Sequence, residues 1–348
     1  MSFSRRTTLT GLSATLAAAL TGCSAAHVRL GPPPKLDTKR LDRDFPALAE
    51  RGRPGDFAVG VLNMGTSQTW CWNAEKHYPL QWAAVLPLAA TVLGEVDAGK
   101  LALAQRVTMT AMDLSPPSSA INAHWPSPPE PYGGSIPLAN LLALAVQAGD
   151  TTAADVLMKA VGGPGAVTAW LEAGGVTDMR VDRYQRERIV EMAALLSFHP
   201  DWKDPAGFVA ARGAAPVADR QKAMEAALVD PRDAATLPAT LNLLLKLAAG
   251  NVLSKTSTQL LTTLLTGTRR GAARLKAGLP KDAALAHVTG ADDTDMGFTP
   301  AVADVGIVTL ADGRRLAIAA FLAGSTGTQA QRDGLFADAA RLIVAAAG

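Results

Sequence analysis

The hydrophobic pattern of the chain is clearest in residues 79–99, where apolar side chains recur at helical spacing. One stripe consists of Val85, Ala89, Val92 and Val96. Gly99 stands where such a helix would stop, and Pro87 is tolerated only if the helix begins just before it. Because nearly every residue of this segment is apolar, the pattern predicts a buried central helix.

The same periodicity, together with glycines and prolines that limit helices, predicts the remaining helices. Their expected ranges are 37–51, 138–147, 151–159, 164–174, 233–250, 254–266 and 330–347. Residues 113–137 are rich in Pro and Ser, which predicts a long loop without regular structure. Residues 180–232 show only weak periodicity.

Alternation with a period of two predicts strands near both ends of the chain. The expected ranges are 57–62, 69–72, 285–289, 303–310 and 315–322. Residues 311–314 predict a hairpin turn between the last two strands. Strands at both ends with helices between them predict one sheet built from both termini, plus an all-helical part.

The first residues have the order of features that an export signal needs. Arg5 and Arg6 precede an apolar stretch that is too short and too rich in Ala and Thr for a membrane span. The paired arginines resemble a twin-arginine signal, and the residues before Cys23 resemble a bacterial lipobox, whose Cys carries the lipid. An ordinary signal peptide is the alternative. The expected divisions are a signal peptide over 1–22, a lipidated tether with the start of the first helix over 23–53, and one domain over 54–348.

Composition narrows the classes of function. A chain of 348 residues with 48% hydrophobic side chains can bury a sizeable core, and a net charge of +2 disfavours nucleic-acid binding. The five histidines have no metal-ligand spacing, so we expect neither a metal nor a cofactor. With Cys23 lipidated, Cys71 is the only other thiol, which excludes an internal disulfide and favours a buried structural thiol. The export signal predicts a bacterial lipoprotein at the periplasmic face of a membrane.

Several stretches resemble class A serine β-lactamases, in matching order over about residues 40–348. Residues 78–107 resemble the family's nucleophile helix and the segment after it. The other stretches are 147–154, 162–167, 228–233, 271–274 and 277–280. The resemblance implies an α+β fold with α/β/α layers, in which an antiparallel sheet from both termini is flanked by helices.

The residues that match the family's catalytic motifs lack the chemistry of those motifs. Trp82 and Val85 stand at the Ser-x-x-Lys pair, in which the serine is the nucleophile and needs a base to remove its proton. The other matches are Gly149, Asp150 and Thr151 at Ser-Asp-Asn, Gln185 at the deacylating Glu, and Val288, Thr289 and Gly290 at Lys-Thr-Gly. Only Asp150, Thr289 and Gly290 are retained, so we predict a protein that does not hydrolyse β-lactams.

A rebuilt catalytic site is an alternative. Its nucleophile would be Thr151 or Thr289, and its base would be Glu187 or His287. His287 equally fits a strand histidine with a hydrogen-bond partner. Trp125 fits either the mouth of the cleft or a loop aromatic packed on the domain.

Three serines in the predicted loop are further candidates, but none has a lysine near it in sequence, so we expect them to be solvated loop residues. They are Ser115, Ser118 and Ser119.

Three functions are compatible with these features. The first is an exported, lipid-anchored β-lactamase-like protein without catalysis, which binds a peptidoglycan fragment, a β-lactam or an envelope protein. The second is an active serine or threonine hydrolase with the rebuilt site. The third is a purely structural lipoprotein without a ligand.

Overall fold

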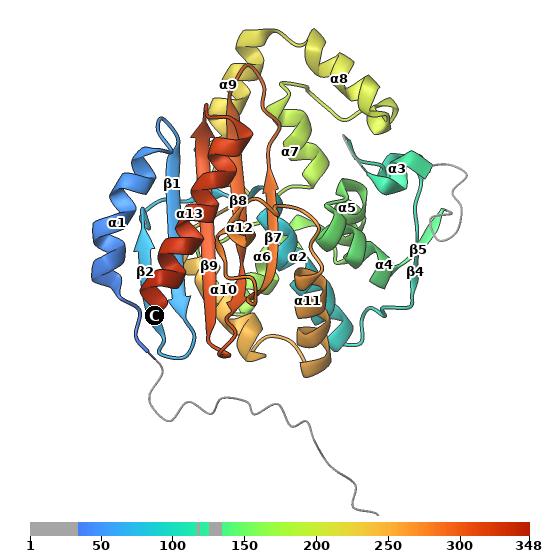
Figure 1. Ribbon diagram of the computed structural model, residues 1–348. Helices are drawn as coiled ribbons and strands as arrows, with labels where there is room; N and C mark the ends of the chain where they lie inside the picture. The colour runs from blue at the N-terminus through green and yellow to red at the C-terminus, as the bar shows by residue number, and fades with distance from the viewer. Residues whose placement is uncertain (1–33, 117–118, 125–133) are drawn as a thin grey trace, which may run out of the picture. The chain divides into compact units, whose positions relative to one another are not determined.

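The computed structural model describes residues 34–116, 119–124 and 134–348 (Figure 1). Its centre is a five-stranded antiparallel sheet in the order β2-β1-β9-β8-β7. The strands are β1 (Asp56–Asn63), β2 (Gln68–Trp72), β7 (Ala284–Ala291), β8 (Thr299–Thr309) and β9 (Arg315–Ser325). The pairing of β1 with β9 joins the two ends of the chain, which confirms the α+β fold and the sheet expected from both termini.

One face of the sheet is covered by α1 (Thr38–Glu50), α12 (Leu275–Gly278) and α13 (Gln329–Ala347). Phe57 of β1 joins the layers, because its ring stacks on that of Phe45 from α1 with centroids 5.9 Å apart. It also meets the ring of Phe336 from α13 edge-on, with centroids 5.4 Å apart. All three rings are buried, so they stabilise the docking of both helices on the sheet.

The opposite face is covered by the 3₁₀ turn η1 (Gln81–Ala84) and by helices of the second layer. The helix α2 (Val85–Asp97) follows η1, is buried over its first nine residues and ends two residues before Gly99, as the sequence predicts. The neighbouring helices also match their expected ranges, with one exception. They are α4 (Leu138–Ala143) with the π-helix η3 (Leu144–Ala148), α5 (Thr151–Ala160), α6 (Pro164–Ala173), α10 (Leu237–Ala249) and α11 (Lys255–Thr266). The exception is α10, which begins at Leu237 instead of at Asp233, because Ala234 and Ala235 pair in a short strand.

The expectation of an irregular, solvated loop over 113–137 is wrong in part. The segment contains α3 (Ala120–His124) and β5 (Ser135–Pro137), which pairs with β4 (Arg106–Thr108). The hydroxyl of Ser115 is buried and donates to Asp155, and that of Ser119 donates to Asp150. Local composition misses these bonds, because each carboxylate lies more than 30 residues further along the chain, at or within α5. Ser118 lies outside the described residues.

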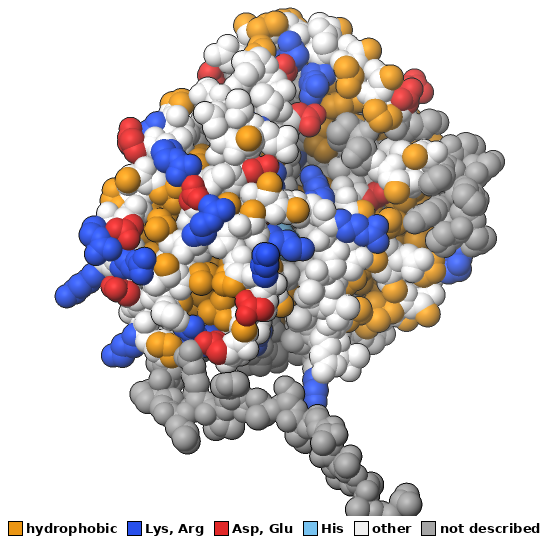
Figure 2. Space-filling view, in the orientation of Figure 1, with side chains coloured by type: hydrophobic (Ala, Val, Ile, Leu, Met, Phe, Trp, Pro, Cys, Tyr) orange, Lys and Arg blue, Asp and Glu red, His pale blue; other side chains and the backbone are white. Residues whose placement is uncertain are grey.

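The region of weak periodicity, 180–232, folds into helices that the sequence does not predict. They are α7 (Gln185–Met192), η4 (Pro200–Lys203), α8 (Pro205–Ala214) and α9 (Val217–Ala227). Their core is small, consisting of Val190, Ala193 and Phe208 with partly buried neighbours, so few positions had to be apolar. Hydrophobic side chains remain on the surface of α8 and α9, among them Val209 and Val217 (Figure 2).

Three shorter elements complete the described structure. The turn η2 (Ala111–Asp113) precedes α3. A short strand pair, β3 (Tyr78–Pro79) with β6 (Ala234–Ala235), leads into η1 and α10. The pair therefore fixes the start of the turn that carries Trp82.

The expected signal peptide over 1–22 and the lipidation site Cys23 lie outside the described residues. Among the helices that the structure does describe, none is both long and apolar enough to span a membrane.

Candidate functional site

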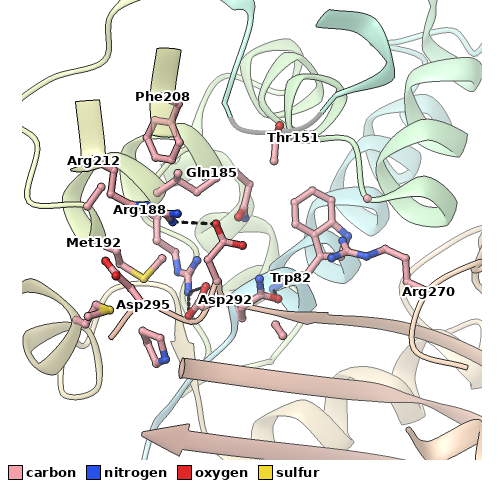
Figure 3. A pocket seen from close by; sticks show the side chains of 18 residues that line it. Trp82, Thr151, Gln185, Arg188, Met192, Phe208, Arg212, Arg270, Asp292 and Asp295 are labelled. Atoms are coloured by element: carbon pink, nitrogen blue, oxygen red, sulfur yellow. Dashed lines mark hydrogen bonds and ion pairs between the residues drawn. The ribbon is translucent and has the colours of Figure 1, made fainter. Parts of the chain in front are cut away.

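A pocket of about 150 Å³ lies where η1, the start of α5, the helices α7 to α9 and the turn between β7 and β8 meet (Figure 3). It brings together four positions that the family resemblance singles out. They are Trp82, Gly149, Thr151 and Gln185. Elements distant in the sequence therefore form one site here.

The turn η1 holds Trp82 in the wall of this pocket. Gln81, just before it, has a φ of +49°, a left-handed conformation that costs a residue with a Cβ about 1–2 kcal/mol. Gly290 on β7 packs directly on the turn, because a Cβ there would lie 2.4 Å from the Cβ of Trp82. Only glycine allows β7 to approach η1 this closely, so Gly290 has a packing role independent of catalysis.

The side chains at the pair Trp82 and Val85 are both buried, with exposed fractions of 3% and 1%. The indole nitrogen Nε1 of Trp82 has no hydrogen-bond partner among the described residues. An unpaired buried donor costs about 1–3 kcal/mol. An indole and an isopropyl group supply neither a hydroxyl nor an amine, so this turn offers no nucleophile for acyl transfer.

Arg270 fills the space that a side chain at position 149 would need. Gly149 has a φ of +73°, and a Cβ built on it would lie 2.1 Å from Nη1 of Arg270. The guanidinium carbon lies 5.5 Å from the centroid of the Trp82 ring, within cation–π distance. Burial, and then the nearby charge of Arg274, lower the pKa of Arg270. Within the described ranges its side chain has no hydrogen-bond or ion-pair partner.

Asp150 connects α5 to the segment before it. Its Oδ1 accepts a hydrogen bond from the backbone N–H of Ala153 at 2.9 Å and caps the helix, while the hydroxyl of Ser119 donates to both carboxylate oxygens. Burial raises the pKa of Asp150. The neighbouring Thr151 hydroxyl donates to the carbonyl of Ser115 at 3.2 Å.

A buried carboxylate, Asp155, fixes the start of α7 and hence Gln185. Its Oδ1 accepts from the backbone N–H of Gln185 at 2.7 Å, and its Oδ2 accepts from the N–H of Arg186 at 3.1 Å and from the Ser115 hydroxyl at 2.6 Å. Burial raises the pKa of Asp155 to about 6, against these hydrogen bonds, which lower it.

Ion pairs attach the helices α7 to α9 to the turn between β7 and β8. Nη2 of Arg188 lies 2.6 and 2.7 Å from the two carboxylate oxygens of Asp292, and both side chains are buried. The other pairs are Arg212 with Asp293 at 3.0 Å and Arg220 with Asp295 at 2.8 Å. Three helices are therefore held over one side of the pocket.

Strand β7 buries the remaining motif positions away from this pocket. Val288 is fully buried in the core on the η1 side of the sheet. The hydroxyl of Thr289 accepts from Nη1 of Arg274 at 2.7 Å and donates to the carbonyl of Ala303 at 2.9 Å.

Comparison with known proteins identifies the family. A sequence model described as "Beta-lactamase enzyme family" matches residues 40–347. The chain belongs to the β-lactamase enzyme family. It is 28% identical to "Beta-lactamase VEB-1" of Pseudomonas aeruginosa, over 82% of this chain and 83% of that protein. "Extended-spectrum beta-lactamase PER-1" of the same species is also 28% identical, over 83% and 82%.

Solved β-lactamase structures share the fold. A β-lactamase from Chitinophaga pinensis superposes with a TM-score of 0.72 at 30% identity, covering 88% of this chain and 99% of that one. The ancestral class A β-lactamase of Gram-negative bacteria superposes with a TM-score of 0.70 at 28% identity, over 88% and 99%. The expected class A serine β-lactamase fold is thus confirmed.

In this β-lactamase-family chain, the other candidate residues lie outside the pocket lining. Glu187 is exposed, and its carboxylate accepts from the backbone N–H of Tyr184 at 2.9 Å. His287 is buried and bonds through Nδ1 to Asp304 at 2.7 Å. Burial raises the pKa of the Cys71 thiol to about 11.

Trp125 lies outside the described residues. In the part of the chain that the structure describes, no three His, Cys, Asp or Glu side chains are placed to hold a metal ion together.

Sequence reasoning missed Arg270 and the arginines of α7 to α9. The only signal for Arg270 is the dipeptide Arg269-Arg270 in a loop, which is typical of any solvated surface. The partners Arg188 and Asp292 are separated by 104 residues, so no spacing rule could pair them.

Proposed function

We propose that this β-lactamase-family protein does not perform acyl transfer and acts by binding a ligand without a covalent bond in the pocket beside Trp82. One observation carries the proposal: a buried indole stands at the position that the resemblance assigns to the serine nucleophile, and an isopropyl group stands where the lysine would be. No change of rotamer or protonation turns either group into a nucleophile or a base.

Two further features support loss of catalysis. Gln185, at the position of the deacylating Glu, has an amide, which cannot take a proton from water. Val288, at the position of the third motif's lysine, has no charge and lies in the core. The pocket is still present in the structure, so the protein can bind a ligand without catalysing a reaction on it. Since the relatives are named β-lactamases, a β-lactam or a cell-wall fragment is the first ligand class to test.

The test is intact-protein mass spectrometry after incubation with benzylpenicillin, together with nitrocefin turnover and thermal unfolding. We expect no added mass and no turnover, and a rise in unfolding temperature with benzylpenicillin or a muropeptide. A penicilloyl adduct would refute the proposal, because it requires a nucleophile. An unchanged unfolding temperature with every ligand would count against binding.

We also propose that the protein is exported and anchored by a lipid on Cys23, as the N-terminal pattern predicts. The full-length chain expressed in a Gram-negative host is expected to partition into the detergent phase of Triton X-114 and to incorporate a fatty-acid analogue. Cys23→Ser should abolish both, whereas the matched variant Cys71→Ser should not. Equal labelling of wild type and Cys23→Ser would contradict the anchor.

A further inference from the structure

The pocket has two ends of different chemistry (Figure 3). At one end, the ring of Trp82 lies beside the guanidinium of Arg270. At the other end, the helices α7 to α9 supply an apolar wall beside the ion-paired Arg188 and Arg212. Its members are Ile189, Met192, Ala193, Phe208 and Met224.

When the charged side chains that line the pocket are matched into ion pairs, one arginine is left without an acidic partner among the described residues. Three arginines and three aspartates line the pocket, namely Arg188, Arg212, Arg270, Asp292, Asp293 and Asp295. The aspartates are all in ion pairs, with Arg188, Arg212 and, outside the lining, Arg220. Over the residues that the structure describes, Arg270 has no acidic partner. The polar end therefore carries a single uncompensated positive charge.

Packing, and not a charge partner, holds Arg270 in place. The absent side chain of Gly149 leaves room for its guanidinium, and the ring of Trp82 lies beside it. A partly buried cation without an acceptor is unfavourable until an anion joins it. A carboxylate would supply the acceptor that this guanidinium lacks.

We infer that the pocket binds a small monocarboxylate, with its carboxylate against Arg270 and its apolar arm among Met192 and Phe208. This inference rests on the proposed non-covalent binding and names the ligand class. A single uncompensated cation matches a single negative charge. A cavity of about 150 Å³ holds benzene in a protein core, so the arm is roughly the size of one phenyl ring.

Three probes separate the two ends of the site: phenylacetate, which has both groups, acetate, which lacks the arm, and 2-phenylethanol, which lacks the charge. Titration calorimetry or ligand-observed NMR measures the binding of each probe to the full-length protein. We expect saturable binding of phenylacetate, at least roughly tenfold tighter than that of either partial probe, since each end contributes one charge-assisted bond or one buried ring.

Two variants and a matched control test which residue contacts the carboxylate of the ligand and which contacts its apolar arm. Arg270→Gln should weaken phenylacetate roughly tenfold or more and leave 2-phenylethanol unchanged. Its control is Arg269→Gln, an exposed neighbour on the same loop, which should change neither. Met192→Gln, which keeps the length of a half-buried side chain, should weaken phenylacetate but not acetate.

The inference is overturned if phenylacetate shows no saturable binding, if 2-phenylethanol binds equally well, or if Arg270→Gln and Arg269→Gln behave alike. These outcomes are distinct from failure of the proposed function, which a penicilloyl adduct would reveal by mass. A muropeptide that raises the unfolding temperature, without any binding of phenylacetate, would keep the proposed function and reject this ligand class.

Discussion

Asp155 makes the stability of this protein depend on pH in a direction opposite to that of most carboxylates. Burial raises its pKa from the ordinary value of 3.8 to about 6. A shift of about 2 pH units corresponds to about 3 kcal/mol, at about 1.36 kcal/mol per unit. Because the folded state holds the proton more tightly, this contribution to the free energy of unfolding is fully present below a pH of about 4. It is lost as the pH rises through about 6.

Asp155→Asn removes the titration and keeps most of the contacts. The amide oxygen can accept from the N–H of Gln185 and the amide nitrogen can donate to the Ser115 hydroxyl, but the hydrogen bond from Arg186 is lost. That loss costs about 1 kcal/mol. The variant is therefore expected to be about 1 kcal/mol less stable than wild type at a pH of about 4 and about 2 kcal/mol more stable at a pH of about 7.5.

Urea denaturation of both proteins at intervals between about pH 4 and about pH 7.5 measures this difference, and all other titrating groups cancel because both chains share them. Ser115→Ala removes a hydrogen bond that lowers the pKa of Asp155, so it should extend the pH-dependent range upward. A difference between wild type and Asp155→Asn that stays constant over this range would show that the reasoning is wrong.

Three further predictions test the site by urea denaturation. Asp292→Ala leaves Arg188 buried without its partner and should cost about 3–5 kcal/mol, whereas Asp293→Ala, whose side chain is 66% exposed, should cost about 1 kcal/mol or less. Trp82→Ala should lower the free energy of unfolding by about 3–5 kcal/mol. Trp82→Phe should lower it by under about 1.5 kcal/mol, because it removes an unpaired N–H and keeps a ring. Equal losses for the two variants would mean that the N–H has a hydrogen-bond partner. Gly290→Ala should cost about 1–3 kcal/mol through its clash with η1, and a neutral effect would contradict the close approach.

The sequence by itself determined the elements with strong apolar periodicity. The central helix, the helices α5 and α6, and the strands from both termini follow from spacing alone, because burial of one face or of all faces leaves a repeating pattern. The order of family-like stretches then determined the fold. The sequence also determined that Trp82 and Val85 supply neither a hydroxyl nor an amine, because the residue types alone decide which functional groups are present.

Only the tertiary structure decided which polar groups meet. The bonds of Ser115 to Asp155 and of Arg188 to Asp292 join segments 40 and 104 residues apart, and no local rule pairs them. The helices α7 to α9 were not predicted, because they share only a small core and face solvent elsewhere, so their sequence has no strong apolar periodicity. The position of Arg270 beside Trp82 depends on the missing side chain of Gly149, and that space exists only once three distant segments have packed together.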